Sequence, residues 1–172
     1  IFSYQAFAGL TPITYQLDGK EVTENAVRYK DGYGYNLGAK KTLRLVTLDW
    51  PPYIDENLCN KGWLYQFTVQ SLLKKGYGVY IGFYPWARAV REAELGKADI
   101  LFPEYLIEED VISDNFLNQT RNSLLALSQP MPGGDLSFVT LKGNSITFNG
   151  DLKSIKEHVI GVVRAYKNTK KL

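Results

Sequence analysis

Two aromatic-rich turns carry the side chains best suited to bind a small molecule. The first reads DWPPY over residues 49–53, and the second reads PWAR over residues 85–88. Each follows an apolar segment. Indole and phenol rings offer flat apolar faces for a solute, although the same rings also pack protein cores. An open α/β sheet places its small-molecule site at turns that follow the carboxyl ends of neighbouring strands. The turns therefore predict one cleft with Trp50 and Trp86 as walls.

Several other kinds of chemistry find little support in the composition. Cys59 is the only cysteine and His158 the only histidine, so we expect no intrachain disulfide, His-based triad or His/Cys metal cluster. The net charge of +2 over 172 residues gives no case for nucleic-acid binding. We interpret the acidic run at residues 108–110 as a solvated loop rather than a cation site. No cofactor is expected.

The elements that must position the two turns follow a β-α-β-α-β order. Apolar runs at residues 43–48, 79–83 and 100–102 are typical of parallel strands covered on both faces. Helices are predicted over residues 63–75 and 85–95, because apolar residues recur there at helical spacing and glycines follow. Short connections then imply right-handed crossovers and a parallel sheet flanked by helices.

The second predicted helix has a clear apolar stripe. It is expected to bury Trp86, Val90 and Ala93. Its charged residues are expected to face outward: Arg88, Arg91, Glu92 and Glu94.

Residues 1–39 differ in character and are predicted to form an N-terminal extension peripheral to the fold. A hairpin is expected there, with Asp18-Gly19 as its turn. Residues 29–38 read YKDGYGYNLG and are interpreted as a loop, because glycine and tyrosine alternate without an apolar pattern.

Residues 40–141 are predicted to form a first α/β lobe that contains the ligand cleft, and residues 142–172 the start of a second lobe. The apolar runs LSFVTLK (136–142) and VIGVV (159–163) are interpreted as strands. Between them, Asp151 is expected to cap a short helix over residues 151–158.

Five features in this order resemble the bacterial periplasmic solute-binding proteins of family 3, the polar-amino-acid type. They are the TxDWPPY turn, the PWxRA helix start, Gly96 with Asp99 before the third strand, Arg121 ahead of LALSQP, and the run DLKSIKEHVIGVV. The resemblance implies a type II periplasmic-binding-protein-like first lobe, with the chain crossing to a second lobe through residues 136–142. It also implies that most of the second lobe lies outside this sequence. The unpaired last strand is then expected to favour self-association.

The resemblance also assigns roles to aromatic residues. Trp50 stands at the position of an aromatic ring that stacks over the bound solute. Trp86 matches a second apolar wall, and Tyr53 lies near it. Trp86 and Tyr53 also follow apolar stripes, so packing in the core is the alternative for both.

Three charged residues complete the expected site. Arg121 stands at the position of the arginine that grips a ligand carboxylate, for which a planar guanidinium fork is well suited. The spacing from Asp99 to Arg121 is longer than the family pattern, so Arg121 as a surface charge is the alternative. Glu104 follows the third strand, where it would suit a ligand amine or hold Arg88 or Arg121 in position.

The resemblance implies a non-enzymatic periplasmic protein that captures a small polar solute, an amino acid or related carboxylate, for an ABC transporter in the membrane. A ligand sensor on the same fold, signalling to a membrane partner, is the first alternative. An enzyme is the second, but catalysis needs a positioned acid-base pair and Glu104 alone gives thin support.

Overall fold

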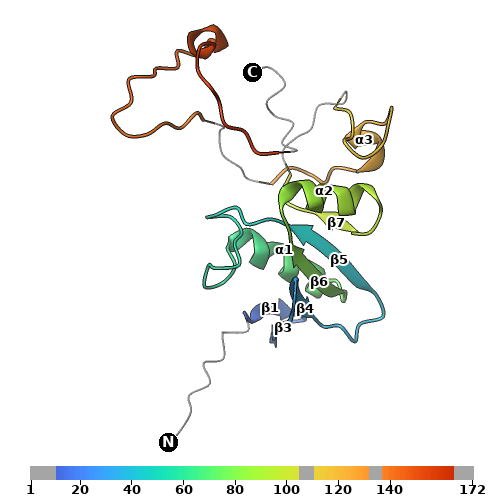
Figure 1. Cartoon of the computed structure of the whole chain (residues 1–172). Coiled ribbons are helices and arrows are strands. Elements are labelled where there is room, and N and C mark those ends of the chain that lie inside the picture. The colour runs from blue at the N-terminus through green and yellow to red at the C-terminus, as the bar shows by residue number, and fades with distance from the viewer. Residues whose placement is uncertain (1–10, 105–110, 132–136, 165–172) are drawn as a thin grey trace, which may run out of the picture.

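The computed structural model describes residues 11–104, 111–131 and 137–164. Within these ranges the chain is a mixed α/β protein built on a five-stranded sheet of order β3-β4-β6-β5-β7 (Figure 1). The strands of this sheet are β3 (Val27–Tyr29), β4 (Gly32–Tyr35), β5 (Thr42–Thr47), β6 (Gly78–Phe83) and β7 (Ile100–Leu101).

The three strands expected from the apolar runs are β5, β6 and β7, and they are parallel. Leu43 of β5 lies opposite Val79 of β6, and Val46 opposite Leu101 of β7. This part of the fold prediction is confirmed. The sheet as a whole is mixed, because β4 pairs with β6 in the antiparallel sense.

Helices α1 (Trp63–Lys74) and α2 (Trp86–Glu94) connect the parallel strands, close to the predicted bounds. Successive side chains of a strand point to opposite faces of the sheet. The side chains of β5 are therefore divided between the core that contains α1 and the core that contains α2. Leu43 and Leu45 belong to the core cluster that contains α1 residues, and Val46 and Leu48 to the cluster that contains α2 residues. The carboxyl end of β5 therefore lies between two packed layers.

Residues 11–39 of the predicted N-terminal extension are part of the fold, so the prediction that they are peripheral was wrong. The expected hairpin forms from β1 (Ile13–Leu17) and β2 (Lys20–Glu24). The segment interpreted as a loop instead supplies β4, whose Tyr33 and Tyr35 are buried in the α1-side core. Gly32 explains why the pattern was missed: a Cβ there would lie 2.0 Å from the Ile81 carbonyl oxygen. The glycine that suggested a loop permits close strand pairing.

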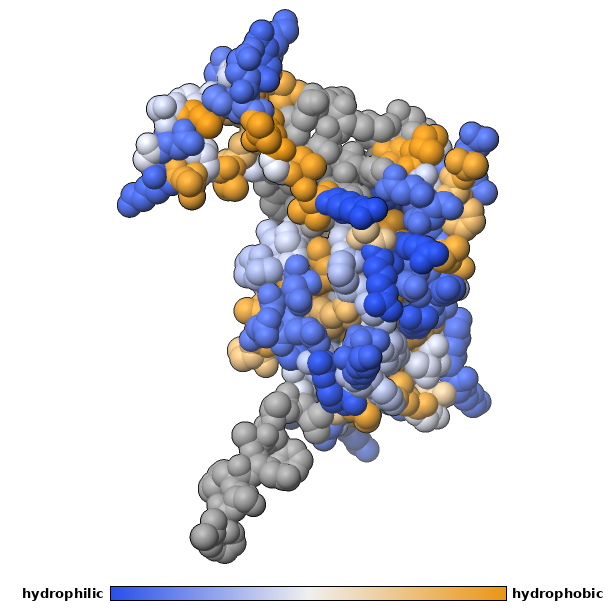
Figure 2. All heavy atoms as spheres, viewed as in Figure 1, coloured by the Kyte–Doolittle hydropathy of each residue, from blue (hydrophilic) through white to orange (hydrophobic). Residues whose placement is uncertain are grey.

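The C-terminal expectations were also wrong in part. The described residues of 136–142 and residues 159–163 form no strand, and Val139 and Val159 are fully or almost fully exposed. The expected helix is a short 3-10 turn, η1 (Leu152–Ile155), although Asp151 caps it as predicted by accepting from Lys153 N–H. Figures 1 and 2 show this segment extending away from the sheet with apolar side chains at its surface. A strand needs a paired neighbour, and among the described residues neither run has one.

Candidate functional site

Three aromatic side chains gather where the chain leaves β5. The rings of Trp50 and Tyr53 are 4.8 Å apart between centroids, and those of Tyr53 and Trp63 are 6.3 Å apart and close to edge-on. Trp50 and Tyr53 are half-buried, whereas Trp63 is 43% exposed. We call Trp50, Tyr53 and Trp63 the aromatic cluster. Its partly exposed rings are suited to contact a solute.

Backbone contacts hold the aromatic cluster in place. The N–H of Trp50 donates to the carbonyl of Ile54 at 2.6 Å, and Leu64 N–H donates to the carbonyl of Tyr53 at 3.1 Å. Gly62, which precedes α1, adopts a φ of +92°, and a Cβ at this residue would lie 2.3 Å from the Tyr53 carbonyl oxygen. A glycine is therefore required where α1 begins against the turn.

Trp86 and Arg88 of the second turn lie in different environments. Trp86 is buried in the α2-side core, the environment of its core-packing alternative. Trp50 packs against that same core, so the two tryptophans border a common apolar layer. Arg88 is exposed, and its guanidinium carbon lies 4.2 Å from the centroid of the Tyr84 ring. The contacts of Trp86 and Arg88 do not test whether these residues bind a ligand, so their binding roles stay predictions.

Arg121 lies in a buried ionic cluster with Glu94 and Glu104. Its Nε lies 3.3 Å from Glu94 Oε1, and its Nη1 lies 3.5 Å from Glu104 Oε2. Arg121 is only 1% exposed, so the surface-charge alternative does not hold. The structure realises one of the two expectations for Glu104, since this carboxylate contacts Arg121.

Glu94 corrects the expectation that every charged residue of α2 faces outward. Its carboxylate is fully buried, where it also accepts hydrogen bonds from Ser113 Oγ at 2.7 Å and from Asn115 Nδ2. A buried carboxylate is tolerated when it is paired and hydrogen-bonded, and here its partners come from a later loop. The sequence of α2 itself contains no pattern that predicts these partners.

Backbone hydrogen bonds join the two ends of that later loop, residues 111–121. Arg121 N–H donates to the carbonyl of Val111 at 2.8 Å, and Ser113 N–H to that of Gln119 at 2.8 Å. The short helix α3 (Arg121–Leu124) follows, with Thr120 as its N-cap. The acidic run at residues 108–110 lies outside the described residues. Arg121 is thus held beside the chain that leaves β7 despite the longer spacing.

A second cluster, which sequence reasoning missed, surrounds the ring of Tyr33. The guanidinium carbon of Arg28 lies 4.4 Å from the ring centroid, and the ammonium nitrogen of Lys61 lies 4.8 Å from it. Glu56 joins both cations: its Oε1 is 2.6 Å from Arg28 Nη1, and its carbonyl oxygen accepts from Lys61 Nζ at 2.6 Å. We call Arg28, Tyr33, Glu56 and Lys61 the Tyr33 cluster.

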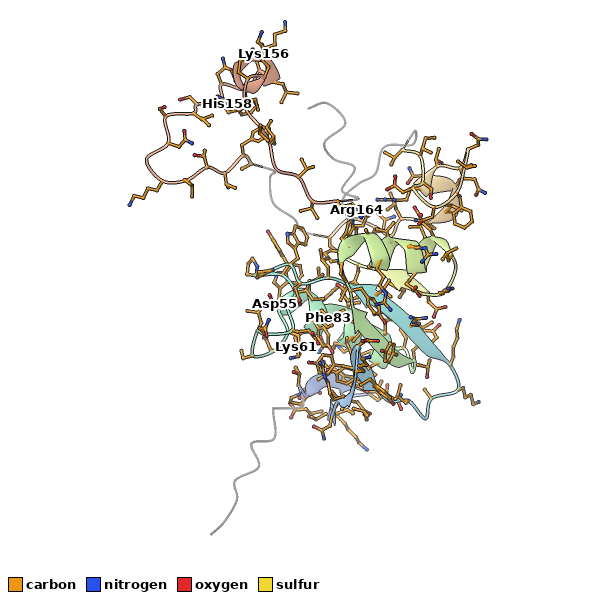
Figure 3. All side chains as sticks on the ribbon, viewed as in Figure 1. Asp55, Lys61, Phe83, Lys156, His158 and Arg164 are labelled. Atoms are coloured by element: carbon orange, nitrogen blue, oxygen red, sulfur yellow. The ribbon has the colours of Figure 1, made fainter. Side chains whose placement is uncertain are left out.

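The Tyr33 cluster lies at the same edge of the sheet as the aromatic cluster. The Tyr33 ring packs edge-on against Phe83, the last residue of β6. Lys61 belongs to the loop that also carries Asp55, whose N–H donates to the Lys61 carbonyl. Figure 3 shows the labelled residues Asp55, Lys61 and Phe83 close to one another. The hydrogen bond to Glu56 raises the pKa of Arg28 further. Two cations are therefore anchored near the carboxyl ends of β5 and β6.

Buried tyrosines support the Tyr33 cluster from the core side. The hydroxyls of Tyr35 and Tyr65 are 2.9 Å apart, and Tyr35 also donates to the carbonyl of Thr11. Burial raises the pKa of Tyr35 to about 12 and raises that of Tyr65 even more strongly. Both hydroxyls are therefore neutral near pH 7, which fits a structural role.

The structure thus divides the predicted site residues into groups. Trp50 and Tyr53 form the aromatic cluster together with Trp63, which was not predicted. Glu104 and Arg121 form the ionic cluster beside the chain that leaves β7, where Phe102 N–H donates to the Val46 carbonyl of β5. Lys61 and Glu94 were missed because lysine and glutamate are rarely buried.

Comparison of the chain with protein-family models, curated proteins and solved structures returned no match. Across the described ranges, no group of three or more His, Cys, Asp or Glu side chains is arranged to hold a metal ion. The helices of these ranges include none with the length and apolar character needed to cross a bilayer.

Proposed function

We propose that this chain is the first lobe of a periplasmic solute-binding protein of family 3. It would capture a small polar solute, an amino acid or a related carboxylate, and present it to an ABC transporter without chemical change. The proposed site is the edge of the sheet where β5, β6 and β7 end.

The observation that carries this proposal is the aromatic cluster at the carboxyl end of β5. Three parallel strands direct their following turns to one edge, which is where open α/β sheets bind small molecules. Trp63 keeps a large part of its surface exposed although it contacts Tyr53. Exposed aromatic rings beside fixed charges suit a solute that has both an apolar part and a polar end.

A ligand screen tests the proposal directly. Thermal unfolding of the whole chain would be followed with a panel of L-amino acids and small carboxylates, because a ligand that prefers the native state stabilises it. We expect at least one compound to raise the Tm and to change the tryptophan fluorescence. A Tm that no compound raises at millimolar concentration would contradict the proposal.

Two exposed aromatic residues of α1 provide a matched pair of variants. Trp63→Ala removes a ring of the aromatic cluster and should weaken solute binding by about 1 kcal/mol, the usual contribution of an aromatic contact. Phe67→Ala, which removes another half-exposed ring of α1 outside the cluster, should leave the affinity unchanged. Equal affinities of the two variants, measured by calorimetric titration, would remove Trp63 from the site.

A further inference from the structure

Lys61 is a buried lysine without a carboxylate partner among the described residues. It is 8% exposed, and its ammonium contacts the Glu56 carbonyl oxygen and the face of the Tyr33 ring. An ammonium group has three N–H donors, and these contacts leave at least one of them for another acceptor. Buried charges are normally paired, so this lysine is an exception that needs an explanation.

The Tyr33 cluster holds two cations and one carboxylate, while the carboxylates of Asp49 and Asp55 in the same loop accept the backbone N–H groups of Glu56 and Asn57. Arg28 lies against the same Tyr33 ring and takes the one carboxylate of the cluster, that of Glu56. Helix α1 begins two residues after Lys61, with Gly62 as an N-cap that provides no side-chain bond and with no acidic residue in its first turn. The amino end of a helix carries a partial positive charge, which adds to that of Lys61 and Arg28.

Arg121, the residue predicted to grip a carboxylate, has the opposite environment. It is 1% exposed and lies against two carboxylates, those of Glu94 and Glu104. A ligand carboxylate brought to this cluster would meet like charges and would have to displace Glu104. Lys61 requires no such exchange and directly precedes Gly62 and Trp63 at the aromatic cluster.

We infer that Lys61 binds the carboxylate of the solute, with Arg28 and the amino end of α1 adding favourable electrostatics. The apolar part of the solute then lies on Trp63 and Tyr53. This inference rests on the proposed function and names the cation that selects the ligand. The site consequently prefers carboxylates to the corresponding neutral amides.

The test uses calorimetric titration of the whole chain with L-amino acids, their α-amides and small dicarboxylates. For the tightest-binding acid, we expect its amide to bind at least about tenfold more weakly, as the loss of a charge-assisted hydrogen bond implies. Lys61→Met should weaken binding of the acid by about 10- to 100-fold and remove the discrimination between acid and amide. Lys41→Met is the matched control, because Lys41 is exposed beside the Tyr77 ring at the other end of β5.

The outcomes separate the inference from the proposed function. If the wild-type protein and Lys61→Met bind the acid with equal affinity, the inference is wrong, although the proposed function still stands. The same conclusion follows if the wild-type protein binds the acid and its amide with equal affinity. Failure of every compound to bind the wild-type chain would overturn both. Should Lys61→Met not fold, side-chain NMR of the wild-type lysines decides, since the signal of Lys61 must shift on titration with the acid.

Discussion

The two buried cations in the described part of the chain are stabilised in different ways. Arg121 lies between the carboxylates of Glu94 and Glu104, whereas Lys61 lies against an aromatic ring and a backbone carbonyl. The first arrangement compensates the cation with charge from the protein itself, so it fixes the loop before α3 to α2 and β7. The second holds a cation without neutralising it. On our proposal, only the cation that lacks a counter-charge from the protein, Lys61, is left to pair with a ligand.

Removing the two cations should therefore have unequal effects on stability. Arg121→Met leaves the buried carboxylate of Glu94 without its cation, which should lower the free energy of unfolding by about 3–5 kcal/mol. Lys61→Met leaves no buried carboxylate unpaired and should lower it by about 1 kcal/mol or less. Urea unfolding measures both values.

Arg91→Met serves as the control for a cation on the exposed face of α2 and should change stability by less than about 0.5 kcal/mol. Equal losses for Arg121→Met and Lys61→Met would show that the two environments do not differ as described.

Gly62 offers a way to perturb the Lys61 side of the molecule alone. Gly62→Ala places a Cβ against the Tyr53 carbonyl at a positive φ, and we expect a loss of about 2–4 kcal/mol. Gly76→Ala has a similar φ of +79° but no atom within 4 Å of the added Cβ. It should lose only about 1–2 kcal/mol, the backbone cost. Thermal unfolding compares the two variants, and an equal loss would mean that Gly62 is not held against the turn.

Alkaline pH should weaken the core beneath the Tyr33 cluster. The pKa of Tyr35 is raised from its ordinary value of 10.0 to about 12, so the unfolded chain ionises first as pH rises. The stabilisation is fully present below pH 10 and is lost as pH rises through about 12, a change of about 3 kcal/mol. Unfolding at a series of pH values measures it, and Tyr35→Phe should reduce the slope. A stability that is constant from pH 10 to 12 would contradict the buried hydroxyl pair.

The sequence predicted the parallel part of the sheet because its signals are local. Apolar runs fixed β5 and β6, and Pro85 and Gly96 marked the ends of α2. The strand β4 was missed because Gly32 and Gly34 break the apolar pattern, although their lack of a side chain is what allows β4 to approach its neighbours. The run at 159–163 was predicted as a strand from composition alone, which contains no information about a pairing partner.

The candidate site shows the same limit. Trp50 and Tyr53 were predicted from their place in a proline-rich turn, and the structure brings them together. Lys61 and Glu94 were not predicted to be buried, because their partners are distant in sequence: Tyr33 lies 28 residues before Lys61, and Arg121 lies 27 residues after Glu94. Burial of a charge depends on such long-range pairs, which a local pattern does not contain.

Binding of a carboxylate solute at the aromatic cluster through Lys61 can be observed in a crystal structure. The crystal should contain the panel compound that stabilises the chain most. We expect the solute to lie against Trp63 and Tyr53, with its carboxylate within hydrogen-bonding distance of Lys61 Nζ and with Arg121 still paired to Glu94. A solute carboxylate bound to Arg121, or a solute placed away from the aromatic cluster, would contradict this expectation.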